Sequence, residues 1–139
     1  MNAKEYLSQA LWLDQRINSK MEQLETLRTL AMKVNANLTE EKVSGGNITK
    51  SHMENTIAKI VDLEKEINED IDRLVDLKAE IMETISQVDD PTCQLLLEMR
   101  YINGKTWEEV ARELSFEVRT AFRLHGKTLK EIELIRNCQ

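Results

Sequence analysis

Residues 57–88 read IAKIVDLEKEINEDIDRLVDLKAEIMETISQV, and a heptad pattern of apolar residues runs through this stretch. Glu64 and Lys78 interrupt the pattern at equivalent positions. A heptad sustained over this length is typical of a helix that packs along another helix, so we expect a helix from about residue 51 to 88. The pattern follows alternating steps of three and four through Ile57, Ile60, Glu64, Ile67, Ile71, Leu74, Lys78, Ile81, Ile85 and Val88.

A second, less regular heptad lies near the N-terminus, and its own breaks match those of the first. In an antiparallel helix pair, facing residues have a constant sum of residue numbers. The breaks pair with one common sum, Asp14 with Lys78 and Arg28 with Glu64, so one register matches both pairs. Charges at a helix seam are costly alone and tolerable in pairs, so we favour this register. The heptad positions are Leu7, Ala10, Asp14, Ile17, Met21, Leu24, Arg28 and Ala31.

These two patterns predict an antiparallel helical hairpin, with a first helix from about residue 3 to 36. The register centres the hairpin on Gly45-Gly46, in the loop-like stretch NLTEEKVSGGNITKS. A second apolar stripe beside the seam favours homo-oligomerisation through residues 1–90, and pairing within or between chains stays open. That stripe holds Trp12, Leu13, Leu27, Leu30, Leu63 and Leu77.

Composition favours an all-α protein with long solvated helices. Only 4% of the 139 residues are aromatic against 32% charged, and the chain has one proline and four glycines. No apolar run is long enough to span a bilayer, so we expect a cytoplasmic protein without membrane contact. Cys93 and Cys138 lack metal-ligand spacing, and no phosphate-binding glycine loop or activated nucleophile is present. We therefore expect no catalytic site, metal or cofactor, with Cys93 as a small buried residue.

The stretch SQVDDPT marks a boundary between a helical arm, residues 1–90, and a second domain, residues 91–139. Pro91 cannot continue the preceding helix, and Asp90 can cap a new one. Charge changes at the same place: residues 1–90 hold 11 Lys and Arg against 18 Asp and Glu, whereas residues 91–139 hold 8 against 7. In the third helix, TCQLLLEMRYI, we expect a core face of Leu95, Leu96, Met99 and Ile102.

Two further helices follow, separated at Ser115-Phe116. Thr106 with Glu109 has the spacing of a capping box and opens a short helix, WEEVARELS. The core stripe of this helix is Trp107, Val110, Ala111 and Leu114, and that of the next is Ala121, Leu124, Thr128 and Ile132.

Cations line the opposite face of the fifth helix. Arg119, Arg123 and Lys127 stand four residues apart along one ridge, followed by Lys130. Like charges at this spacing repel one another, so such a ridge usually serves a negatively charged partner. Alternatively, the ridge is a solvated face that faces the glutamates of the acidic arm and serves no separate partner.

At these residues the sequence resembles region 4 of sigma factors. RYINGKTWEEVARELSFEVRTAFRLHGKTLKEIE resembles more closely the C-terminus of ArpU/RinA-type phage transcription regulators, over about residues 92–133. The resemblance implies a phage or prophage regulator whose helix-turn-helix binds double-stranded DNA. It places Val118, Arg119, Phe122, Arg123, Lys127 and Lys130 at DNA-facing positions. The sequence departs from the family at Ser115, where glycine is common, and at Glu117, a weak N-cap.

Two other functions remain open. The C-terminal domain could engage RNA polymerase or a sigma factor without binding DNA. The acidic arm favours this alternative, because its negative charge supports contact with protein over contact with DNA. A small terminase-like DNA-packaging protein also combines a helix-turn-helix with helical oligomerisation. His125 occupies a position where the family often has histidine, and it either contacts DNA or packs on the fourth helix.

Overall fold

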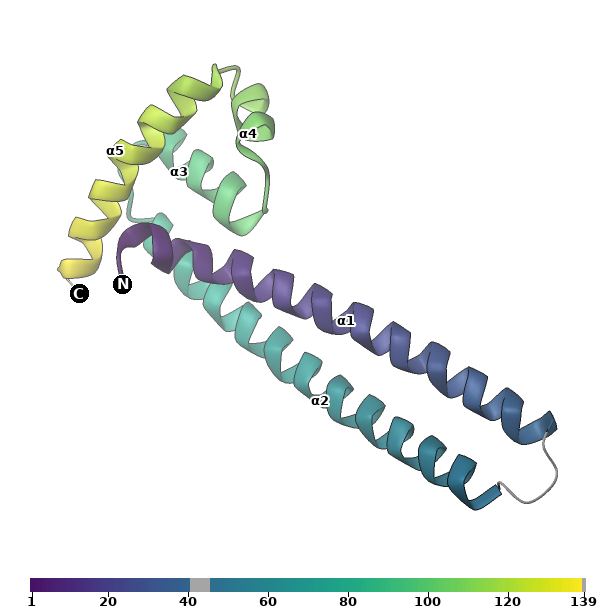
Figure 1. Cartoon of the computed structure of the whole chain (residues 1–139). Helices are drawn as coiled ribbons and strands as arrows, with labels where there is room; N and C mark the ends of the chain where they lie inside the picture. The colour runs from purple at the N-terminus through teal and green to yellow at the C-terminus, as the bar shows by residue number, and fades with distance from the viewer. Residues whose placement is uncertain (41–45, 139) are drawn as a thin grey trace. The chain divides into compact units, whose positions relative to one another are not determined.

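The computed structural model describes residues 1–40 and 46–138, and each regular element within these ranges is a helix (Figure 1). The predicted all-α fold, a long helix pair followed by shorter helices, is confirmed. The chain divides into two units, residues 1–14 with 73–139 and residues 15–72. The elements are α1 (Ala3–Glu40), α2 (Gly46–Ile85), α3 (Pro91–Leu97), the π-helix η1 (Glu98–Ile102), α4 (Trp107–Glu113) and α5 (Val118–Asn137).

The two long helices extend further toward their connection than the sequence predicts. Helix α1 continues to Glu40 and α2 already begins at Gly46. Of the predicted centre of the hairpin, Gly45 lies outside the described residues. At the other end, Asp90 accepts a hydrogen bond from the Thr92 amide at 2.8 Å and Pro91 is the first residue of α3, as expected for a capped start. The division into a helical arm, residues 1–90, and a second domain, residues 91–139, stays a prediction.

Within residues 15–72, α1 and α2 run antiparallel in the predicted register. Arg28 Nη2 lies 3.0 Å from Glu64 Oε1, which confirms this charge pair. The other predicted pair, Asp14 with Lys78, stays a prediction. Arg28 and Glu64 are about half-exposed, so the pair lies beside the seam and contributes little to stability.

The residues that fill the seam differ in part from the predicted heptad, by one position along each helix. Met21, Ile57 and Ile71 were expected in the seam, but 52%, 49% and 41% of their surface is exposed. Lys20 and Asp70 lie there instead. Both helices carry apolar residues over a stripe wider than one heptad face, so two neighbouring stripes were compatible with the sequence. The residues of this unit that line the seam are Ile17, Lys20, Leu24, Leu27, Ile60, Leu63, Ile67 and Asp70.

This rotation also corrects the stripe that was assigned to oligomerisation. Trp12 and Leu30 are exposed, as that assignment requires. Leu27 and Leu63 are only partly exposed and Leu13 is buried.

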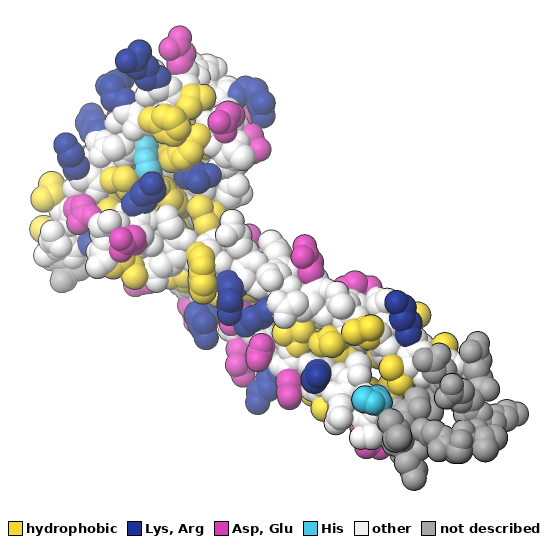
Figure 2. Space-filling model, in the orientation of Figure 1, with side chains coloured by type: hydrophobic (Ala, Val, Ile, Leu, Met, Phe, Trp, Pro, Cys, Tyr) yellow, Lys and Arg dark blue, Asp and Glu magenta, His cyan; other side chains and the backbone are white. Residues whose placement is uncertain are grey.

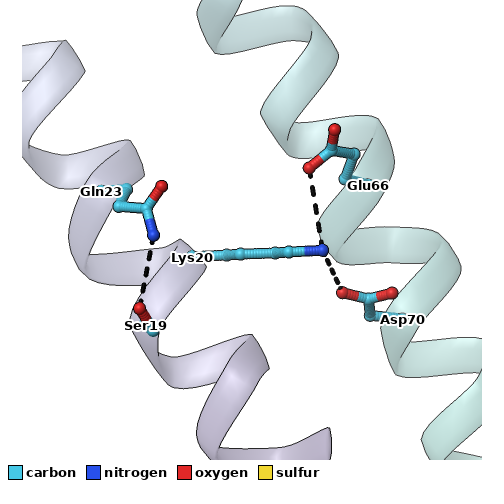
Figure 3. Close-up of polar contacts among 5 residues, drawn as sticks. All are labelled: Ser19, Lys20, Gln23, Glu66 and Asp70. Carbon is cyan, nitrogen blue, oxygen red and sulfur yellow. Dashed lines mark hydrogen bonds and ion pairs between the residues drawn. The ribbon is translucent and has the colours of Figure 1, made fainter.

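An ion pair at the centre of the seam was not predicted. Lys20 extends from α1 to α2, where its Nζ lies 2.6 Å from Asp70 Oδ2 and 3.7 Å from Glu66 Oε2 (Figure 3). Only 17% of the Lys20 side chain and 9% of the Asp70 side chain are exposed. Water therefore screens this pair less than the Arg28–Glu64 pair.

In the unit formed by residues 1–14 and 73–139, α5 packs against α3 and α4. The C-terminal part of α5 also contacts the start of α1: Glu133 accepts a hydrogen bond from the Ala3 amide at 2.6 Å, and the Arg136 guanidinium lies 4.1 Å from the Tyr6 ring centre. The core draws on all these elements. Its buried members include Leu7, Ala10, Ile81, Ile85, Val88, Leu96, Leu97, Tyr101, Val110, Ala111, Ala121 and Ile132.

The core face of α3 is partly different from the predicted one. Leu95 was expected inside but is 41% exposed, whereas Cys93 and Leu97 are buried. Cys93, Leu96 and Leu97 follow the three- and four-residue steps of one helix face, and Leu95 lies outside that set. Tyr101, which lies within η1 and four residues after Leu97, continues this buried face.

Candidate nucleic-acid interface

Helix α4 begins at the predicted cap. Thr106 has an extended backbone, and its side chain accepts a hydrogen bond from the Glu109 amide at 3.2 Å. Val110 and Ala111 are buried, so they fix which face of this short helix meets α5. Both residues belong to the predicted core stripe, whose other members, Trp107 and Leu114, are partly buried.

The turn between α4 and α5 is built by an unusual backbone at Ser115. Its φ is +59°, the left-handed conformation that is costly for residues other than glycine. The Phe116 amide then donates to the Ala111 carbonyl at 2.8 Å, which closes the end of α4. Glu117 occupies the N-cap of α5 with no side-chain capping bond. The sequence departs from the resembled family at these same two positions.

Helix α5 turns the predicted stripe toward the core. Ala121, Thr128 and Ile132 are buried and Leu124 is partly buried, which confirms this face. The Thr128 hydroxyl donates to the Leu124 carbonyl at 2.7 Å, so its polar atom is satisfied inside the helix.

His125 belongs to the same inner side, so it packs within the unit. Its Nε2 lies 2.6 Å from the Tyr101 hydroxyl, and the Trp107 ring meets its edge at 4.5 Å between ring centres. Burial lowers the pKa of His125 to about 4, with smaller contributions from Lys4 and Arg100. Burial raises the pKa of Tyr101 to about 12, against the opposing effect of Arg100. Both groups are therefore neutral at pH 7.

The solvent side of α5 carries the predicted cations. Figure 2 shows Lys and Arg side chains along the edge of this unit where α5 lies in Figure 1. Four of them, Arg119, Arg123, Lys127 and Lys130, are exposed. They make one positively charged face, opposite the buried stripe.

Two predicted site residues are apolar and differ in exposure. Phe122 is 51% exposed, and its ring rests on Trp107 with 5.4 Å between ring centres. Val118 is only partly exposed and packs against the core. Phe122 can therefore contact a ligand from a supported position, whereas Val118 offers a ligand less surface.

Sequence reasoning did not single out Arg100, which supports the site from η1. Its Nη1 donates to the Lys105 carbonyl at 2.9 Å, and its guanidinium lies 5.2 Å from the Trp107 ring centre. Tyr101 and His125 are 24 residues apart, and Arg100 and Trp107 belong to different helices, so no helical spacing rule predicts these contacts. Arg100, Trp107 and His125 together form a packed layer beneath Phe122.

Neither a metal-ligand cluster nor a membrane-spanning helix is found in the part of the chain that the structure describes. No cluster of three or more His, Cys, Asp or Glu side chains is placed there to hold a metal ion. None of the described helices has the length and apolarity needed to cross a membrane.

The comparisons with known proteins identify a family. No curated protein and no solved structure matches the chain. The resemblance to ArpU/RinA-type regulators stays a prediction. A family model described as "Protein of unknown function (DUF1492)" matches residues 32–133, which is more than half of the sequence. The protein therefore belongs to the DUF1492 family.

Proposed function

We propose that the protein is a sequence-specific DNA-binding transcriptional regulator that places α5 in the major groove. The observation that carries the proposal is the division of α5 into two faces. Arg119, Arg123, Lys127 and Lys130 are exposed, while Ala121, Thr128 and Ile132 on the same helix are buried. A helix of this kind fits the width of the major groove, and its cations meet phosphates and base edges.

The side chains along this face have different proposed roles. Arg119 and Arg123 are proposed to bond the O6 and N7 atoms of guanine or a phosphate. Lys127 and Lys130 neutralise phosphates, which positions the helix without reading sequence. Phe122 is proposed to pack on a thymine methyl group. Val118 contributes less, because it is partly covered by the core.

The resemblance to sigma region 4 and to ArpU/RinA-type regulators supports this function and a phage or prophage origin. We further propose that residues 1–90 carry homo-oligomerisation, as their exposed apolar residues suggest. An oligomer presents more than one α5 to DNA, and the spacing of half-sites would then follow the symmetry of the protein.

The test is selection of bound sequences from random duplex DNA, followed by anisotropy titration of the selected site. Replacing Arg123 by Ala should cost about 1–3 kcal/mol if Arg123 reads a base. Lys127→Ala should weaken binding similarly on all sequences and reduce the salt slope by about one. Lys65→Ala, which removes an exposed cation from α2, is the control. Unchanged binding by the Arg119→Ala/Arg123→Ala double variant would reject the proposal.

A polymerase- or sigma-binding adaptor is the second candidate, favoured by charge. Residues 1–90 hold 18 acidic against 11 basic residues, which disfavours contact of the arm with DNA. The adaptor predicts co-purification with RNA polymerase that survives nuclease treatment, together with no retardation of promoter DNA. Retardation of promoter DNA in a gel by the purified protein alone would favour the DNA-binding regulator over the adaptor.

A further inference from the structure

The hairpin of residues 15–72 leaves apolar side chains uncovered. Its buried residues number only four among those described: Ile17, Leu24, Ile67 and Asp70. Two helices in one layer can cover only the faces that they turn to each other, so a second layer is needed to bury the rest. The large apolar residues left exposed in this unit are Met21, Leu30, Met32, Ile57, Val61 and Ile71.

Several of these residues lie on one side of the hairpin. Arg28 and Glu64 bond at 3.0 Å, which places their positions on the same side of the helix pair. Met21 lies seven residues before Arg28. Ile57 and Ile71 lie seven residues on either side of Glu64, and seven residues are close to two helical turns. Met21, Arg28, Ile57, Glu64 and Ile71 therefore share a surface, called here the Met21–Ile71 flank.

The spacing of this flank fits another helix. Along α2, the exposed Ile57, Val61 and Ile71 continue with steps of three and four through Glu64 and Asn68. The same three- and four-residue steps run through the seam residues of α2, each of which lies one position earlier in the sequence. A helix with two adjacent heptad stripes is typical of a bundle of more than two helices, in which each stripe faces a different neighbour.

The charges of the flank fit a second copy of the same chain. Arg28 and Glu64 neutralise each other at its centre, and Glu25, between Met21 and Arg28 in the same helical steps, is the further charge there, so two identical flanks meet with little like-charge repulsion. A nucleic acid or strongly acidic partner would find no excess of cations there. In a two-fold dimer the same surface must complement itself, which a balanced and apolar flank does.

We infer that the Met21–Ile71 flank binds the same flank of a second copy, so that two hairpins form a four-helix layer around a two-fold axis. The inference names the surface used for oligomerisation. It does not require that the protein bind DNA, because the contact lies wholly within residues 15–72.

Sedimentation velocity of the full chain over a wide concentration range, without DNA, tests the inference. The wild-type protein should sediment as a dimer, and Ile71→Glu should raise the dissociation constant by about tenfold or more, since each dimer gains two unpaired buried acids. Leu30→Glu is the matched control. Leu30 is similarly exposed, at 45%, but lies about 200° around α1 from Arg28 and thus off the flank.

Circular dichroism must show equal helix content in the two variants. A wild-type protein that stays monomeric, an Ile71→Glu variant that dimerises normally, or a Leu30→Glu variant that dissociates equally would each overturn the inference. A monomer that captures a different protein through Ile71 would overturn it too. Since no DNA is present, failure of the proposed DNA binding leaves these results unaffected.

Discussion

The Tyr101 hydroxyl lies 2.6 Å from Nε2 of His125, and this hydrogen bond joins η1 to the middle of α5. His125 is buried, while Phe122 and Arg123 of the same helix face solvent. Rotation of α5 about its axis would break the bond and move the basic face. The Tyr101–His125 contact thus fixes which residues α5 presents.

The first prediction concerns pH. Burial holds the pKa of His125 at about 4 in the folded protein, against 6.5 for an unperturbed histidine. Between these values the unfolded chain binds a proton that the folded chain does not, so stability should fall as the pH drops from about 6.5 to about 4. Urea unfolding at a series of pH values measures this loss. His125→Phe keeps a ring without a titrating group, and an equal slope in that variant would contradict the assignment.

The second prediction compares the two ion pairs of the hairpin. Asp70→Ala leaves the Lys20 ammonium in the seam with only the more distant and more exposed Glu66 as a partner, and it should reduce the free energy of unfolding by about 2–3 kcal/mol. Glu64→Ala removes an exposed partner of Arg28 and should cost about 0.5 kcal/mol or less. Chemical denaturation of both variants measures the difference. Equal losses would mean that burial does not distinguish the pairs.

The third prediction concerns the turn before α5. Ser115 holds a φ of +59°, which glycine adopts without penalty. Ser115→Gly should therefore raise the free energy of unfolding by about 0.5 kcal/mol, the relief of strain exceeding the entropy lost. Ser115→Val should lower the free energy of unfolding by about 1 kcal/mol or more, because a β-branched residue fits this conformation poorly. Thermal unfolding of the two variants should shift in opposite directions.

The fourth prediction concerns the uncapped start of α5. Glu117 makes no side-chain capping bond, so serine there should accept one from the first turn and stabilise the protein by about 1 kcal/mol. The same change removes a negative charge next to Arg119. If α5 binds DNA, Glu117→Ser should also tighten binding at low salt. Glu117→Gln, which removes the charge without adding a good cap, separates the two effects.

The sequence predicted the helices and the capping residues well, because these depend on neighbours within one turn. Thr106 and Asp90 cap where expected, and Ala121 and Thr128 face inward. The Arg28–Glu64 pair was also found, since charges that break a heptad need partners. These features follow from spacing alone.

The rotation of the seam and the layer beneath α5 could not be derived in the same way. Met21 and Ile71 are more apolar than Lys20 and Asp70, which lie in the seam instead, so apolarity alone does not select the stripe and the choice depends on packing across the hairpin. Tyr101 and His125 are 24 residues apart, and no local signal predicts their contact. Leu95 was wrongly predicted to be in the core, because α3 is short and has leucine at three consecutive positions, which does not show which of them faces inward.

The Lys20–Asp70 ion pair also limits how the hairpin can misfold. Seven residues on either side of Asp70 stand Leu63 and Leu77, and seven on either side of Lys20 stand Leu13 and Leu27. With leucine at all these positions, the two helices could slide past each other by a whole heptad at little cost. Any such slip would place Lys20 beside leucine and Asp70 beside leucine, leaving two buried charges unmatched. One polar layer therefore selects a single alignment of two otherwise repetitive helices.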